Sequence, residues 1–154
     1  MKAWIVAASL LVLTRGVLGG TVEVKQHRKP TTKEVDALKR LASQTVLHVE
    51  TSLKKIEAPG VLTTVAEFTG AVVLPARKLR AEWSGFPFSD RVMFAYSGCV
   101  GALSDLEVYA MDAQRPPKYY LSDMALKKRQ YIQEGLEQCK PLRSTSPSAT
   151  DMGL

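Results

Sequence analysis

The 154-residue sequence contains no asparagine, only two histidines and only two cysteines. Without asparagine it has no N-glycosylation sequon, which a eukaryotic secreted protein of this size often carries, so the composition leans towards a bacterial protein. The two histidines, His27 and His48, have no second histidine or cysteine at the spacing of a metal site. We therefore predict no metal site and no cofactor.

Catalytic motifs are also missing. There is no P-loop and no dinucleotide-binding glycine pattern, and residues 97–101 lack the G-x-S-x-G order of a nucleophile elbow. His48, beside an apolar stripe, is interpreted as a boundary residue that hydrogen-bonds or faces water. Glu67 is interpreted as a solvated carboxylate, with a desolvated acid/base group as the alternative. We predict no catalytic residue, since an enzyme would require His48 or Glu67 to face a pocket.

Long hydrophobic runs are absent except at the start of the chain. Residues 1–20 combine Lys2, an apolar core over residues 3–13 and small residues around a cleavage point, which is typical of a secretory signal peptide. The apolar core is shorter than the roughly 20 residues that cross a bilayer, although a retained anchor is the alternative. We predict a protein exported to a bacterial periplasm or secreted, soluble and without a stable membrane span after cleavage.

No strong excess of charge is present. Removing Lys2 and Arg15 with the signal peptide lowers the basic count from 21 to 19, against 15 acidic residues, for a net charge of +4. This mild surplus is spread along the chain and favours a mixed, solvated surface. Nucleic acid is not an expected partner, whereas an acidic protein partner is compatible with the charge.

The two cysteines are Cys99 and Cys139. In an oxidising compartment an even pair inside predicted structure favours one disulfide. The alternative, a reactive thiol pair, lacks the C-x-x-C spacing and a nearby histidine.

Apolar residues recur at helical spacing in four segments. The first begins at a capping box of Thr31 and Glu34 and ends at residues 59–60, and its stripe is Val35, Leu38, Ala42, Val46, Val49, Leu53 and Ile56. The second stripe is Val61, Val65, Phe68, Val72, Ala76, Leu79 and Trp83, which predicts a helix kinked at Pro75, with two shorter helices or a strand at residues 71–74 as alternatives.

The third segment begins near Ser89, and its stripe is Val92, Tyr96, Cys99, Leu103, Leu106 and Ala110. The fourth follows Pro117 and ends before Pro141, with Leu121, Met124, Tyr131, Ile132, Gly135, Leu136 and Cys139 on or beside one face. We predict an all-α fold, an antiparallel four-helix bundle over residues 21–141 with one disulfide between the third and fourth helices. Residues 142–154 are predicted to be a disordered tail.

Aromatic residues are few, and they gather with basic residues at two predicted junctions between helices. Tryptophan, tyrosine and arginine are enriched at binding hot spots, so these junctions are candidate partner sites. They lie at opposite ends of an up-and-down bundle and so form two surfaces, unless the aromatic side chains close the ends of the core instead. The candidate binding residues are Trp83, Phe86 and Arg91 at one junction and Arg115, Tyr119 and Tyr120 at the other.

Together these features favour a small exported protein-binding module, such as an immunity or inhibitor protein that neutralises a secreted or periplasmic enzyme. The alternative is a structural or accessory subunit of a cell-envelope assembly, in which the first helix pairs with another chain or with a second copy. Leu41 and Leu47 lie off the main stripe of that helix, and exposure of both would favour self-association. An enzyme with an unfamiliar site is the third hypothesis.

Overall fold

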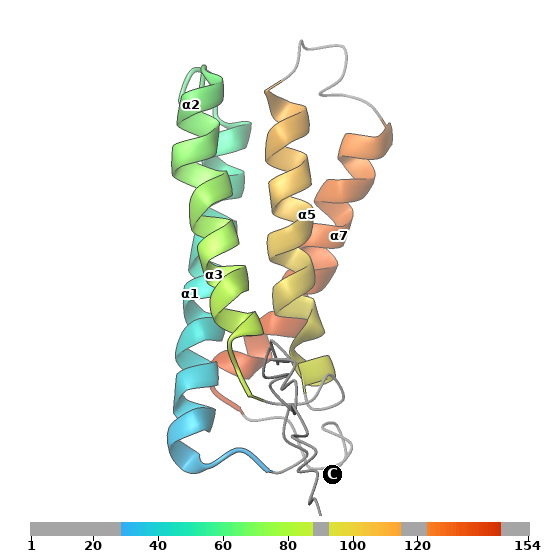
Figure 1. Ribbon diagram of the computed structural model, residues 1–154. Coiled ribbons are helices and arrows are strands. Elements are labelled where there is room, and N and C mark those ends of the chain that lie inside the picture. The colour runs from blue at the N-terminus through green and yellow to red at the C-terminus, as the bar shows by residue number, and fades with distance from the viewer. Residues whose placement is uncertain (1–28, 88–92, 115–122, 146–154) are drawn as a thin grey trace, which may run out of the picture.

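The computed structural model describes residues 29–87, 93–114 and 123–145 (Figure 1). Several predictions from the sequence lie outside these ranges and stay predictions. They are the signal peptide of residues 1–20, the starts of the third and fourth helical segments with Ser89, Val92, Pro117 and Leu121, the candidate binding residues Arg91, Arg115, Tyr119 and Tyr120, and residues 146–154 of the tail.

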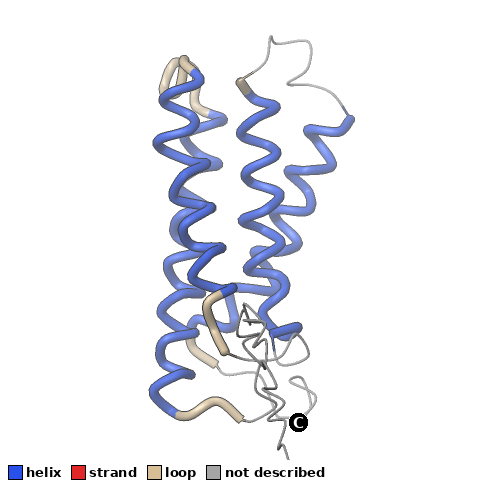
Figure 2. Tube along the Cα trace, in the orientation of Figure 1, coloured by secondary structure: helices blue, strands red, loops and turns tan. Residues whose placement is uncertain are grey.

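The described residues form helices and contain no strand. Their order is α1 (Thr32–Glu57), α2 (Val65–Phe68), a π-helical turn η1 (Thr69–Val73), α3 (Leu74–Ser84), a 3-10 turn η2 (Phe94–Tyr96), α5 (Ser97–Ala113), α7 (Asp123–Cys139) and a 3-10 turn η3 (Lys140–Arg143). These elements make four long helical stretches that pack against one another, with α2, η1 and α3 forming one of them (Figure 2). The predicted all-α, four-helix architecture is confirmed.

Helix α1 begins at the predicted capping box. The Thr31 side chain accepts a hydrogen bond from the Glu34 backbone, and the Glu34 carboxylate accepts one from the Thr31 backbone at 2.7 Å. Six of the seven predicted stripe residues are buried, and Val35 is half-buried. Leu41 also lies in the core, while Leu47 is 67% exposed. The widened apolar surface that would have favoured self-association is therefore absent, because only Leu47 of the pair faces outward.

The second helical stretch starts later than predicted. Residues 58–64 form a loop in which Gly60 has a φ of +74°, a conformation that glycine adopts without steric cost, and Val61 lies in this loop. Helix α2 then begins with a second capping box, Thr64 with Glu67. The helix passes through Pro75, and the turn before it is the π-helical η1, in which the Leu74 N–H bonds to the Thr69 carbonyl five residues back. The alternative of a strand at residues 71–74 is therefore wrong, and the kink at Pro75 stays a prediction. Pro75 has no N–H to donate to the preceding turn, and the extra residue of the π-helical turn accommodates it there.

Helix α5 packs against α1, α3 and α7, and most extensively against α7. Tyr96, Cys99, Leu103, Leu106 and Ala110 are buried, as the spacing predicts. Gly98 and Gly135 let α5 and α7 approach closely, since a Cβ built on Gly98 would lie 2.5 Å from the Gln138 Cβ. The Cys99–Cys139 disulfide is present beside this contact.

The C-terminal end of the bundle extends past the predicted domain end at residue 141. Turn η3 continues to Arg143 and packs against α1, with Leu142 partly buried against the core. Burial of the apolar Leu142 side chain explains why the chain stays against the bundle after α7 ends. None of the described helices is both long enough and apolar enough to cross a bilayer.

Candidate functional site

Trp83 is a core residue, not a contact residue. Its side chain is 2% exposed, its Nε1 donates a hydrogen bond to Thr45 Oγ1 at 3.0 Å, and its ring packs against Tyr96 with centroids 5.5 Å apart. Phe86 is half-buried and packs against the same core. The prediction that Trp83 contributes to a partner site is therefore wrong. These aromatic side chains close one end of the bundle, which was the alternative interpretation.

His48 connects α1 to the π-helical turn. Its Nε2 lies 3.2 Å from the Val72 carbonyl oxygen and 3.5 Å from Ser52 Oγ. Burial lowers the pKa of the imidazole, and the positive charge of Lys55 lowers it further, while the bond to Val72 raises it. A neutral imidazole that donates to Val72 accounts for this geometry, and neither surface hollow described below contains His48.

Glu67 is a helix cap. Its Oε2 accepts hydrogen bonds from the backbone N–H groups of Thr63 and Thr64 at 2.7 and 2.9 Å and from the Thr63 hydroxyl at 3.0 Å. These bonds favour the charged carboxylate and lower its pKa to about 2. The alternative prediction of a desolvated carboxyl with a raised pKa is therefore wrong, because the side chain is exposed and its donors stabilise the anion.

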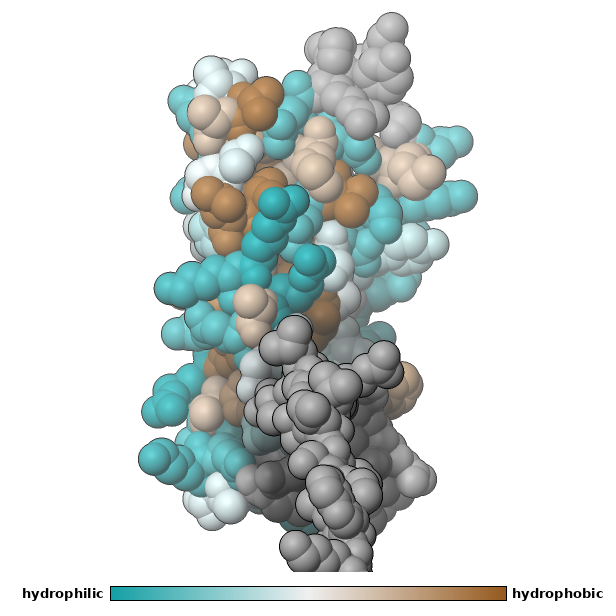
Figure 3. Space-filling view, viewed as in Figure 1, coloured by the Kyte–Doolittle hydropathy of each residue, from teal (hydrophilic) through white to brown (hydrophobic). Residues whose placement is uncertain are grey.

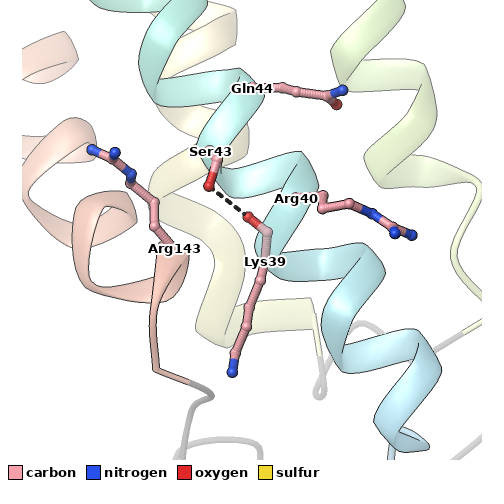
Figure 4. A pocket seen from close by; sticks show the side chains of 5 residues that line it. All are labelled: Lys39, Arg40, Ser43, Gln44 and Arg143. Carbon is pink, nitrogen blue, oxygen red and sulfur yellow. Dashed lines mark hydrogen bonds between the residues drawn. The ribbon is translucent and has the colours of Figure 1, made fainter.

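A basic hollow of about 330 Å³ lies where η3 meets α1. It is lined by Lys39, Arg40, Ser43, Gln44 and Arg143, with no acidic residue among them. Figure 4 shows that the charged ends of Lys39, Arg40 and Arg143 point in different directions, and that the Ser43 hydroxyl bonds to the Lys39 carbonyl. Diverging cations do not form a binding site for one small anion.

A second hollow, of about 300 Å³, follows the seam between α1 and α7. Its lining mixes both signs of charge with apolar residues: Glu50, Leu53, Lys54, Glu57, Arg129, Gln133 and Leu136. Arg129 Nε lies 2.6 Å from Glu57 Oε1, and Lys140 Nζ lies 3.6 Å from Glu50 Oε1. Because these charges neutralise one another across the seam, the hollow favours no particular class of ligand.

The most specific polar cluster joins α3 to α5. Glu107 of α5 is a buried carboxylate whose side chain is only 6% exposed. Arg77 Nε donates to its Oε2 at 3.0 Å, and Arg80 Nη1 lies 3.2 Å from its Oε1. Arg80 also donates to Ser104 Oγ at 3.2 Å. Two guanidinium groups thus surround one carboxylate, which leaves the cluster with a net positive charge.

Exposed apolar side chains lie beside this cluster. Since Arg77 is paired with Glu107 and Arg80 with Ser104, the antiparallel register brings Leu74 level with Ala110, the residue before Met111. Leu74 is 55% and Met111 41% exposed. Figure 3 shows hydrophobic side chains gathered over this part of α2, α3 and α5, with hydrophilic side chains across and below them. We call the surface formed by Leu74, Arg77, Arg80, Ser104 and Met111 the α3–α5 face.

Sequence reasoning missed this face. Arg77 and Arg80 belong to the basic surplus that the composition assigns to a mixed, solvated surface, and no sequence motif singles out Glu107. The available signal was local. Glu107 follows Leu103 by four residues and Leu106 by one, which places it at the edge of the core stripe of α5, where a carboxylate needs a cationic partner.

The fold and these sites define a disulfide-linked, all-α bundle with no metal-binding group of His, Cys, Asp or Glu among its described residues. Comparisons with protein-family models, with curated proteins and with solved structures each give no match.

Proposed function

We propose that this chain is an exported helical protein-binding module that acts by occupying a protein partner, as an immunity or inhibitor protein does. The observation that carries the proposal is the α3–α5 face, where exposed Leu74 and Met111 lie beside two arginines whose guanidinium groups are held in position. Binding surfaces combine an apolar centre with oriented polar groups, and arginine is enriched at their energetic centres. The disulfide and the absence of a spanning helix among the described residues are compatible with export.

The alternative, an accessory subunit of an envelope assembly that pairs through α1, has narrower support. Leu47 is the one large apolar side chain of α1 that is strongly exposed, because Leu41 lies in the core. The two proposals therefore place the contact on different surfaces, and each surface offers an exposed leucine for substitution.

Matched variants test the proposal. We would compare the oxidised protein with Leu74→Glu and with Leu47→Glu, using affinity capture from envelope and supernatant fractions of the source and a size-exclusion profile of each bait. We expect a stoichiometric partner that binds the wild type and the Leu47 variant and is lost with Leu74→Glu. Retention of every partner by the Leu74 variant would refute the role of the α3–α5 face. Loss of self-association only in the Leu47 variant would favour the envelope assembly.

A further inference from the structure

Two arginines converge on a single buried carboxylate at the α3–α5 face. Arg77 and Arg80 come from successive turns of α3, and both reach Glu107 on α5 within 3.2 Å. One arginine would suffice to neutralise one carboxylate. The second guanidinium therefore adds a positive charge that the internal cluster does not need.

The cluster also leaves hydrogen-bonding capacity unused. Each guanidinium carries five N–H donors, and the bonds to Glu107 and Ser104 involve only Nε of Arg77 and Nη1 of Arg80. Glu107 Oε1 accepts no hydrogen bond from the described residues, although Arg80 Nη1, which donates to Ser104, lies 3.2 Å from it. The side chains of Arg77 and Arg80 remain 55% and 42% exposed. Each guanidinium group is thus fixed by a bond to Glu107 or Ser104, while its other N–H groups are available to a second acceptor.

The chemistry of that acceptor follows from the donors. A guanidinium presents a planar fork that matches the two oxygens of a carboxylate and forms short, charge-assisted hydrogen bonds. Fixing the fork in advance lowers the conformational entropy lost on binding. Leu74 lies three residues before Arg77, so an apolar side chain beside the acidic one would also find a contact.

We propose that Arg77 and Arg80, oriented by Glu107 and Ser104, recognise a carboxylate side chain in an acidic peptide segment of the protein partner. This inference rests on the proposed protein-binding function and adds the chemistry of the partner to it. Glu107 is a positioning residue that does not touch the ligand, whereas the two arginines do.

The site can be tested without the partner. We would titrate the oxidised, full-length, ¹⁵N-labelled protein with a hexaglutamate peptide, using a hexaglutamine peptide as the control, and follow the arginine Nε–H resonances by NMR. Hexaglutamate is expected to shift the Arg77 and Arg80 resonances, with an affinity that falls as salt rises, and hexaglutamine is not. Equal shifts with both peptides, or none with either, would overturn the proposal.

Variants separate recognition by the fork from simple attraction of charge. Replacing Arg77 and Arg80 together by lysine keeps the charge beside Glu107 and removes the forks, and we expect affinity to fall about tenfold, the equivalent of losing one charge-assisted hydrogen bond. Arg40→Gln, which removes one charge from the basic hollow, should leave the affinity unchanged. An equal loss in both variants would overturn the proposal in favour of general surface charge.

Glu107→Gln gives the sharper test. It raises the net charge of the cluster, so charge alone predicts tighter binding of hexaglutamate, whereas loss of orientation predicts weaker binding. Weaker binding with an unchanged circular dichroism spectrum is the expected result, and tighter binding contradicts the positioning role. Binding to anionic phosphatidylglycerol vesicles would be measured as well. If the protein binds these vesicles more tightly than hexaglutamate, the ligand of the site is a lipid surface and the acidic peptide is ruled out.

The outcomes also distinguish this inference from the proposed function. A captured partner that is lost with Leu74→Glu but retained by the double lysine variant would support protein binding and overturn carboxylate recognition. Specific hexaglutamate binding without any captured partner would support the carboxylate site while the proposed function fails.

Discussion

Thr45 and His48 lie on adjacent turns of α1, and each forms one hydrogen bond with the second helical stretch. Thr45 Oγ1 accepts from Trp83 Nε1 at 3.0 Å, and His48 Nε2 lies 3.2 Å from the Val72 carbonyl. Polar groups inside an apolar interface are costly unless they meet their partners. These two contacts therefore favour one register of α1 against the second helical stretch over neighbouring ones, a specificity that apolar packing alone does not supply.

His48 makes the stability of the fold depend on pH. The folded protein lowers the pKa of the imidazole below its ordinary value of 6.5, chiefly by burial, so the unfolded chain binds more protons as the pH falls. Stability should therefore decrease as the pH is lowered through and below about 6.5. Urea denaturation at pH 7, 6 and 5 would measure this slope. In His48→Gln, whose amide retains an N–H donor, we expect a shallower slope, and an unchanged slope would contradict the assignment.

Glu67 should titrate far below an ordinary glutamate. Because the hydrogen bonds from Thr63 and Thr64 lower its pKa from 4.5 to about 2, its capping contribution is complete above pH 4.5 and is lost as the pH falls towards 2. An NMR titration of the side-chain carboxyl carbon would measure the midpoint directly. A midpoint near 4.5 would show that the second capping box does not persist in solution.

The two glycines of helix α5 differ in how closely helix α7 approaches them. A Cβ on Gly98 would meet Gln138 Cβ at 2.5 Å and the Gly135 carbonyl oxygen at 3.0 Å, whereas a Cβ on Gly101, one turn away, would meet nothing within 4 Å. Both are glycines of the same helix. Only Gly98 is required by packing, and Gly101 reduces the helical propensity of α5 without a steric reason.

Alanine substitutions should separate the two glycines. Gly98→Ala forces the backbones of α5 and α7 apart and should lower the free energy of unfolding by about 1–3 kcal/mol, the usual cost of overpacking. Gly101→Ala, the matched control, should raise it by about 0.5–1 kcal/mol. Chemical denaturation of both variants would measure the difference, and similar effects at the two positions would contradict the described packing.

Across the molecule, the helices are held by one apolar core, one covalent link and a few ion pairs between helices. The disulfide closes a sequence separation of 40 residues and joins the two helices that pack most extensively, α5 and α7. Two surface ion pairs also join α1 to the C-terminal part of the bundle: Arg129 of α7 pairs with Glu57, and Lys140 of η3 pairs with Glu50. Surface ion pairs contribute at most about 1 kcal/mol each, so the apolar core and the disulfide hold α7 more strongly than these pairs do.

Removing the disulfide should therefore affect the whole fold. Replacing Cys99 and Cys139 together by alanine should lower the free energy of unfolding by about 3–4 kcal/mol in non-reducing buffer, on the loop-entropy model. In reducing buffer the wild type should lose most of this advantage, so the two proteins should unfold at similar temperatures. A difference that is the same in both buffers would assign the loss to packing instead of the covalent link.

The helices, the capping box at Thr31 and the buried stripe of α5 could be predicted from the sequence because they depend on residues within a few turns of each other. The Cys99–Cys139 link could be predicted because two cysteines allow only one pairing within the chain. The exposure of Val65 and Met124 could not, since both continue a helical stripe yet lie near the ends of their helices, where no neighbour covers them.

The sequence places Glu107 at the edge of the core stripe, but only the tertiary structure shows which residues pair with it. Arg77 and Glu107 are 30 residues apart, and nothing local indicates that α3 and α5 align in a register that pairs them. The same holds for Trp83. Its position at a predicted junction between helices is typical of a contact residue, and only the structure shows that its N–H donates to Thr45, 38 residues earlier in the chain. Short-range periodicity determines which residues form helices and which face is apolar, whereas the alignment of one helix against another determines which charges meet and which aromatic residues reach the surface.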